Sequence, residues 1–107
     1  MFTHRKIIFY KSYFQEFYVQ QNQIVREKIG FVFTLIQTAE RVPERFLKHI
    51  EGTNGLYEIR VITGSNHYRI FCCFGNQQVV VLFNAFQKKS AKTPPNEKAK
   101  ALTFGHL

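Results

Sequence analysis

The most constraining feature of the sequence is a period of two in its second half, broken by two short turn sequences. Successive side chains of a β-strand point to opposite faces of a sheet, so this period predicts strands at 56–62, 67–74 and 77–83. The connections, at 63–66 and 75–76, are short enough to join neighbouring antiparallel strands. We therefore expect an antiparallel meander, which must be covered by other elements to bury a core.

The first half predicts a strand followed by two helices. Residues 5–10 are mainly β-branched and aromatic, which favours a first strand. After Ser12, a candidate N-cap, aromatic residues up to Tyr18 recur at spacings of three and four, as on one side of a helix. The same spacing returns over 25–39 and indicates an amphipathic helix that ends near Arg41. We expect these two segments to form a helical hairpin.

Two shorter helices are expected, one before the sheet and one at the C-terminus. Pro43 can open a helix through Leu47, because the first helical turn does not need the missing N–H. After the sheet, Asn96 can cap a weak helix over 97–102. The pattern predicts an α+β fold in a single domain of residues 1–107: an N-terminal strand and a helical hairpin packed on one face of a twisted antiparallel sheet, with a short C-terminal helix.

The chain is strongly basic: 15 Lys and Arg against seven Glu give a formal net charge of +8 and a pI near 9.8. Residues 56–107 hold seven bases and two acids, so the predicted sheet and tail carry +5 of this charge. Such a field attracts polyanions, but it does not distinguish RNA from DNA, a membrane surface or an acidic protein. No apolar stretch approaches the roughly 18 residues of a membrane-spanning helix, so we expect a cytoplasmic protein with no membrane partner.

Two cysteines, Cys72 and Cys73, are neighbours in the second predicted strand and should point to opposite sheet faces. They are not placed to bond to each other, and no Cys or His lies at a metal-ligand spacing from them. We expect two free thiols, no metal and no cofactor.

Charged residues on adjacent strands are the first candidates for a site. Glu58 and Arg60 share one face of their strand, and His67 and Arg69 share one face of the next. An arginine in mid-strand is costly to bury unpaired, so both arginines are expected on the face that carries Glu58, away from the helical hairpin. Three further bases from the end of the sheet would complete a concave basic surface: Lys88, Lys89 and Lys92. The alternative is a solvated sheet face with a Glu–Arg pair worth about tenths of a kcal/mol.

Aromatic and basic residues are interleaved between Phe83 and Lys89, as they are where bases stack and phosphates are neutralised. Phe86 is the candidate for a base contact in this segment. Phe83 and Phe86 fit equally well in a hydrophobic core.

These motifs resemble those of a family of toxins. The C-terminal half is similar to HigB-like, phage-derived toxins of the RelE/ParE superfamily in four stretches: Gly55–Arg60, Tyr68–Phe71, Val80–Lys89 and Lys92–Pro94. Residues 43–49 resemble the segment that precedes the sheet in that family, and the helical hairpin has the expected length. The likeness spans nearly the whole chain.

The resemblance implies both a fold and an activity. The fold is one of helices packed against a twisted antiparallel sheet. The activity is that of an mRNA interferase, a ribosome-dependent endoribonuclease that inhibits translation as the toxin of a type II toxin–antitoxin system. The partners implied are mRNA, the ribosome and a helix-turn-helix antitoxin, encoded beside the toxin and forming an oligomer with it.

Carried over by position, Arg60 and Arg69 match the strand bases that hold the scissile phosphate, and Lys88 or Lys89 matches a base just after the last strand. RNA can cleave itself once its 2′-hydroxyl is deprotonated and aligned, so the protein supplies positioning, charge and proton transfer without a metal. We expect Arg69 to stabilise the phosphorane, Arg60 to orient the phosphate, and Glu58 or a lysine to move the proton. The candidates for RNA binding are Lys89, Lys92, His67 and Phe86.

Related toxins place a Tyr or His near the C-terminus for acid–base work, where this chain has Thr93, Asn96 and His106. Two other functions therefore stay open at this point. One is a ParE-like, non-enzymatic inhibitor of DNA gyrase, and the other is a nucleic-acid-binding module that cuts nothing.

Overall fold

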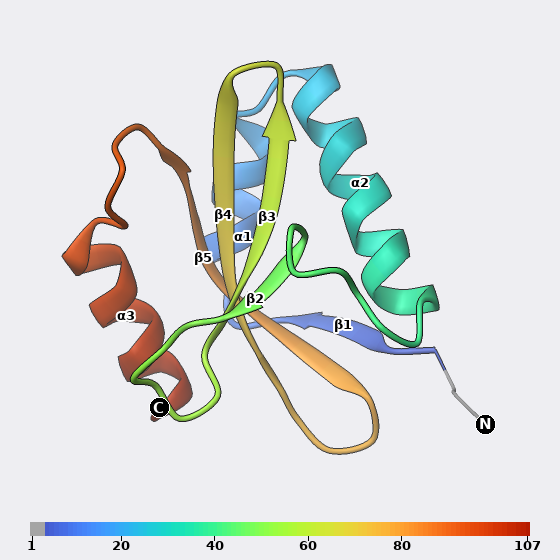
Figure 1. Cartoon of the computed structure of the whole chain (residues 1–107), viewed down its shortest axis with the longest axis vertical. Coiled ribbons are helices and arrows are strands. Elements are labelled where there is room, and N and C mark those ends of the chain that lie inside the picture. The colour runs from blue at the N-terminus through green and yellow to red at the C-terminus, as the bar shows by residue number, and fades with distance from the viewer. Residues whose placement is uncertain (1–3) are drawn as a thin grey trace.

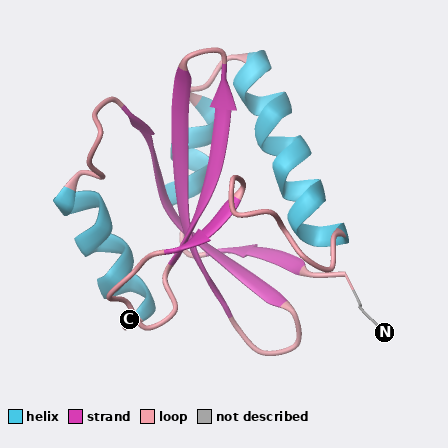
Figure 2. Cartoon of the chain, viewed as in Figure 1, coloured by secondary structure: helices cyan, strands magenta, loops and turns pink. Residues whose placement is uncertain are grey.

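Helices lie on both faces of a mixed β-sheet in the structure, a computed structural model that describes residues 4–107 (Figures 1 and 2). The elements follow in the order β1 (Lys6–Phe9), α1 (Tyr13–Val19), α2 (Gln23–Thr38), β2 (Leu47–His49), β3 (Tyr57–Thr63), β4 (Asn66–Phe74), β5 (Val79–Lys88) and α3 (Pro95–Gly105). Within the described residues, no helix is both long and apolar enough to cross a membrane.

The predicted meander forms the centre of the sheet. Across the described chain the strand order is β1-β5-β4-β3-β2, in which β3, β4 and β5 pair antiparallel as expected. The first predicted strand, β1, pairs parallel with β5 and makes the sheet mixed. The other edge is β2, which pairs antiparallel with β3 over only three positions, from Leu47 opposite Ile59 to His49 opposite Tyr57.

The short helix predicted from Pro43 to Leu47 is wrong. The Pro43 carbonyl accepts bonds from the N–H groups of Phe46 and Leu47, which closes a single turn. The helix does not continue, because the Phe46 carbonyl accepts from the Arg60 N–H at 2.8 Å and the next residues join the sheet as β2. Pairing with β3 therefore prevails over the local helical signal.

The helical hairpin is confirmed, and it covers one face of the sheet. Asn22 caps α2, since its side-chain oxygen accepts from the Val25 N–H at 3.0 Å. The apolar spacing seen in the sequence becomes the buried stripe of α2, and this helix ends at Thr38, slightly before the expected position. Ser12 stands at the N-cap of α1, but its hydroxyl donates to the Glu16 carboxylate instead of binding a backbone N–H. The main core lies between these helices and the sheet.

The turn predicted at 75–76 lies two residues later. Gln77 and Gln78 adopt φ values of 59° and 65°, and the Gly75 N–H closes the turn on the Val79 carbonyl at 2.8 Å. Strand β5 then continues to Lys88, past the predicted end at Phe83, through a register shift: Cys72 pairs with Leu82, whereas Ile70 pairs with Ala85.

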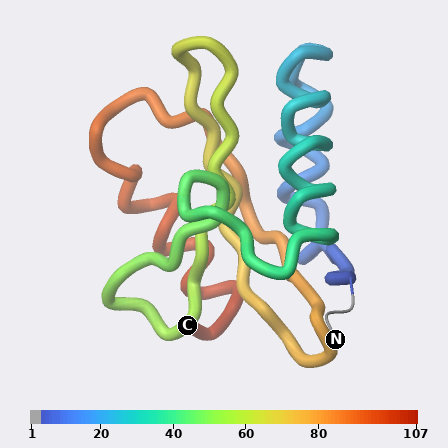
Figure 3. Tube along the Cα trace, turned by 45° about the vertical axis from the view of Figure 1, so that its right-hand side comes forward, coloured from blue at the N-terminus to red at the C-terminus, as the bar shows by residue number. Residues whose placement is uncertain are grey.

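The opposite face of the sheet carries a second core under α3, on the other side from α1 and α2 (Figure 3). The buried residues of this core are Leu56, Phe71, Phe83 and Ala101. Helix α3 is longer than predicted and begins after Pro94, so Asn96 lies in its first turn and is not the cap. The Asn84 amide anchors α3 by donating to the Glu97 backbone carbonyl at 3.0 Å and to its carboxylate at 2.8 Å.

The two cysteines are free and lie on opposite faces, as expected. Cys72 belongs to the main core, and Cys73 packs against the second core. Burial raises the pKa of both thiols above the usual range for cysteine.

Candidate nucleic-acid interface

A single carboxylate joins the two strand arginines. Arg60 on β3 pairs in register with Arg69 on β4, so their side chains leave the same face of the sheet. Glu58 Oε2 lies 3.3 Å from Arg60 Nε and 2.6 Å from Arg69 Nε. Glu58 and Arg69 are only 9% and 7% exposed, whereas the Arg60 side chain is 26% exposed. The predicted Glu–Arg pair is thus a nearly buried triad instead of a solvated surface pair.

The charge of Arg69 is only partly compensated in this triad. Burial lowers the pKa of Arg69, and the neighbouring Arg60 lowers this pKa further, while Glu58 opposes both effects. Arg69 Nη1 donates to the Tyr68 carbonyl at 3.2 Å. Arg69 Nε lies 2.6 Å from Glu58 Oε2, which places the two charges in direct contact. An anion that reaches this guanidinium would gain a strong partner.

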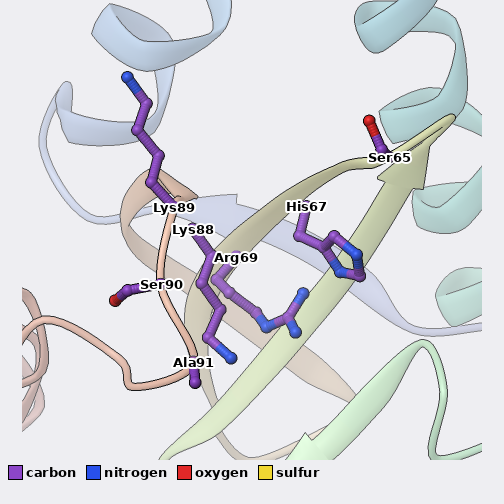
Figure 4. A pocket seen from close by; sticks show the side chains of 7 residues that line it. All are labelled: Ser65, His67, Arg69, Lys88, Lys89, Ser90 and Ala91. Atoms are coloured by element: carbon purple, nitrogen blue, oxygen red, sulfur yellow. The ribbon is translucent and has the colours of Figure 1, made fainter.

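Arg69 opens onto a polar pocket of about 440 Å³, the phosphate pocket. The residues lining it are Ser65, His67, Arg69, Lys88, Lys89, Ser90 and Ala91. His67 pairs in register with Lys88, two positions along the strands from the pair of Arg69 with Phe86, so both pairs share one face. In Figure 4 the side chains of His67, Arg69 and Lys88 approach one another, whereas the Lys89 side chain points away from them. The described lining residues include cations and an imidazole but no carboxylate, which suits a phosphate group.

The loop after β5 forms one wall of the phosphate pocket. Ser90 Oγ donates to the Lys92 carbonyl at 2.9 Å, and the Asn84–Glu97 bonds hold the start of α3 beyond the loop. Lys92 is exposed and does not line the pocket. His106 follows α3 at the end far from this loop, which places it away from the pocket (Figure 1).

Phe86 is not a lining residue of the phosphate pocket. Its ring lies 5.6 Å from the ring of Phe71 and packs against the second core. Phe83 and Phe86 are therefore core residues, which is one of the two alternatives that the sequence left open. Phe86 therefore contributes no ring to this pocket.

Arg60 faces a second pocket, which corrects the expectation that both arginines converge in one. This second pocket, of about 400 Å³, is lined by Lys28, Phe31, Arg45, Phe46, Arg60 and Ile62. Of these residues, only Arg60 was predicted from the sequence to belong to a site. Strand alternation cannot reveal side chains that a helix and a turn bring around the sheet edge. One signal was present: Phe31 lies outside the apolar stripe of α2, on the polar side of the helix.

Comparisons with known proteins agree with this architecture. A chain of the crystal structure of the archaeal RelE–RelB complex from Pyrococcus horikoshii superposes with a TM-score of 0.55 at 18% identity. The superposition covers 85% of the present chain and 100% of the archaeal one, so the fold is RelE-like. No curated protein matches the sequence. Residues 16–104 match the family described as "Phage derived protein Gp49-like (DUF891)". The chain therefore belongs to the Gp49-like family of phage-derived proteins.

Proposed function

We propose that this protein is the toxin of a type II toxin–antitoxin system, of the HigB-like branch, and that it cleaves mRNA on the ribosome. The observation that carries the proposal is the phosphate pocket, where Arg69, Lys88 and His67 approach one another on the open part of a RelE-like sheet. A pocket with this charge binds a phosphodiester, and an imidazole beside it can move a proton.

The residues divide the chemistry of RNA cleavage among them. The 2′-hydroxyl attacks the adjacent phosphorus in line, forms a 2′,3′-cyclic phosphate and expels the 5′-oxygen, so a base must take one proton and an acid must supply another. Arg69 and Lys88 stabilise the charge that develops on the phosphorane. Glu58 is nearly buried and contacts both arginines, so it positions them instead of touching RNA. Proton transfer falls to His67 and Lys88, which line the pocket.

The antitoxin is the expected protein partner. The archaeal RelE was crystallised with RelB, and a chain with a net charge of +8 offers an acidic partner ample attraction. We propose a helix-turn-helix antitoxin, encoded next to the toxin, that covers the phosphate pocket and excludes RNA from it.

Primer extension on mRNA from cells that express the protein tests the proposal. New 5′ ends inside translated regions are expected for the wild type, and they should disappear for Arg69→Ala and for Lys88→Ala. Arg41→Ala is the matched control, since it removes one positive charge from an exposed residue between α2 and β2. Lys88 is not part of the triad with Glu58, so a loss of cleavage in Lys88→Ala cannot be attributed to a disrupted triad.

Other outcomes would replace the proposal. A DNA-damage response without new mRNA ends would identify a gyrase inhibitor. Normal growth without new ends, at an equal level of folded protein, would identify a nucleic-acid-binding module that does not cut. Cleavage by Arg69→Ala at the wild-type rate would remove Arg69 from the site.

A further inference from the structure

The second pocket, lined as described above, combines three cations with two aromatic rings. Lys28 and Phe31 come from α2, Arg45 and Phe46 from the turn before β2, and Arg60 from β3. None of the described residues that line it is acidic. Phe31 is 54% exposed and belongs to neither core, so its ring is available to a ligand.

The second pocket lies at the edge of β3 that β2 leaves unpaired. Pairing between β2 and β3 stops at Ile59, followed by one backbone bond from the Arg60 N–H to the Phe46 carbonyl. Beyond Arg60, no other strand in the described chain covers this edge of β3. Side chains of α2 can therefore reach around the edge and lie beside residues of the open sheet face.

The two rings of the pocket contact each other, and each has a cation beside it. Lys28 Nζ lies 5.0 Å from the centre of the Phe31 ring, and Arg45 Cζ lies 4.8 Å from that of Phe46. The two rings are 6.2 Å apart and meet edge to face at 70°. Phe46 packs against the main core, so Phe31 is the exposed ring. Proteins stack the bases of single-stranded nucleic acid on exposed rings flanked by cations, which neutralise the backbone.

The second pocket adjoins the phosphate pocket on the same face of the sheet. Arg60 of the second pocket pairs in register with Arg69 of the first, and Ile62 pairs with His67. Residues directly opposed in antiparallel strands have Cα atoms about 4.5–5.5 Å apart. Both arginines also contact one Glu58 oxygen. A nucleic-acid strand held by Arg69 can thus meet the Arg60 guanidinium without leaving the protein surface.

We propose that the second pocket is a binding subsite for a nucleotide that flanks the scissile phosphate in single-stranded RNA. The base stacks on Phe31, and Arg45, Arg60 and Lys28 bind the adjoining phosphates. This inference rests on the proposed function, because it extends the same RNA path from the phosphate pocket. It adds a site that binds an unpaired base by stacking and does not distinguish one base from another.

The main competitor is a protein partner, because two aliphatic side chains are also exposed nearby. Ile24 is 70% exposed and Ile62 is 44% exposed, and Ile24 lines a neighbouring depression together with Phe31. A docking peptide would use all of these apolar groups, whereas a stacked base needs only the ring. Ile24→Ala therefore separates the two, since it removes apolar surface beside the second pocket and leaves every lining residue of that pocket in place.

The decisive experiment measures binding of the full-length protein to a fluorescein-labelled oligouridine of about ten nucleotides, 2′-O-methylated to prevent cleavage. Fluorescence anisotropy should show Phe31→Ala binding at least about fivefold more weakly, the lower limit for loss of one stacked base. Phe31→Tyr should restore the affinity, and Ile24→Ala should leave it unchanged. Lys28→Gln and Arg45→Gln should each reduce the slope of log affinity against log salt by about 0.7.

The outcomes distinguish this proposal from the proposed function. If Arg69→Ala weakens RNA binding and Phe31→Ala does not, the phosphate pocket stands and the subsite is refuted. If Phe31→Ala and Ile24→Ala both weaken the antitoxin complex but leave RNA binding intact, the surface is a protein dock and the subsite is again refuted. If oligouridine binding responds to Phe31 but cells show no new mRNA ends, the subsite stands and the nuclease assignment fails. Thermal unfolding of each variant verifies its fold.

Discussion

The triad of Glu58 with two arginines makes a strong prediction about stability. Replacing Glu58 with Gln keeps the size and the hydrogen-bonding capacity of the side chain but removes its charge. Arg60 and Arg69 then face each other across adjacent strands without an anion between them. Arg69 is 7% exposed and retains the Tyr68 carbonyl as a partner, so solvent can compensate little of its charge.

The size of the effect follows from this burial. Removing one partner of a buried ion pair costs about 3–5 kcal/mol. The glutamine oxygen still accepts hydrogen bonds and the Arg60 side chain is 26% exposed, so the loss should lie at or just below the lower end of this range, about 2–3 kcal/mol. A domain of this size has a free energy of unfolding of about 5–15 kcal/mol, and the urea midpoint should fall by about 1–2 M.

Urea denaturation is the suitable assay, because guanidinium salts would screen the charges under study. Inorganic phosphate should stabilise Glu58→Gln more than the wild type, measured against chloride at the same ionic strength, since an anion can replace the lost carboxylate. The double variant Glu58→Gln/Arg69→Met should lose less than the sum of its single changes. A Glu58→Gln protein within about 0.5 kcal/mol of the wild type would refute the idea that the carboxylate holds the arginines.

Three further changes test the interface and its supports. Asn84→Ala should lower the free energy of unfolding by about 1–2 kcal/mol and speed hydrogen exchange in α3, because both bonds to Glu97 are lost, whereas the exposed Asn96→Ala should do neither. His67→Gln should slow cleavage of ribosome-bound mRNA by about 100-fold or more with unchanged RNA affinity, and an unchanged rate would assign proton transfer to Lys88. Burial raises the pKa of Cys72, so above about pH 9 only the unfolded state loses this proton and stability falls by up to about 1.4 kcal/mol per pH unit. Cys72→Ala should lack this share of the decline, and parallel pH curves for the two proteins would contradict the assignment.

The sequence predicts those features that one strand or one helix determines by itself. The period of two places Glu58 and Arg60 on one face of β3, and the structure confirms that His67 and Arg69 lie on the same face of β4. The spacing of apolar residues in α2 likewise predicts its buried side, from Val25 onwards. Each of these patterns is local, so no knowledge of the neighbouring elements is needed to interpret it.

The sequence also predicts the antiparallel meander and the helical hairpin, but not the contacts made at the edges of the sheet. Residues 43–47 resemble the start of a helix, but their outcome depends on the edge of β3, some ten residues further along the chain. The same holds for Phe31 and Arg45, which share a pocket only because β2 is too short to cover that edge. Their charge and aromatic character are visible in the sequence, whereas their proximity is a property of the tertiary structure.

The register shift in β5 decides whether the phosphate pocket exists. Before the shift Val81 pairs with Cys73 on the face of the second core, and after it Phe86 pairs with Arg69 on that same face. Strict alternation from Val81 would instead direct Lys88 toward the helical hairpin, away from Arg69. The extra residue thus turns Lys88 to the open face beside His67. It also leaves Asn84 at the irregularity, where its amide holds α3 and thereby the loop that walls the pocket. One irregularity in β5 therefore both brings the Lys88 charge into the pocket and positions the loop that forms the pocket wall.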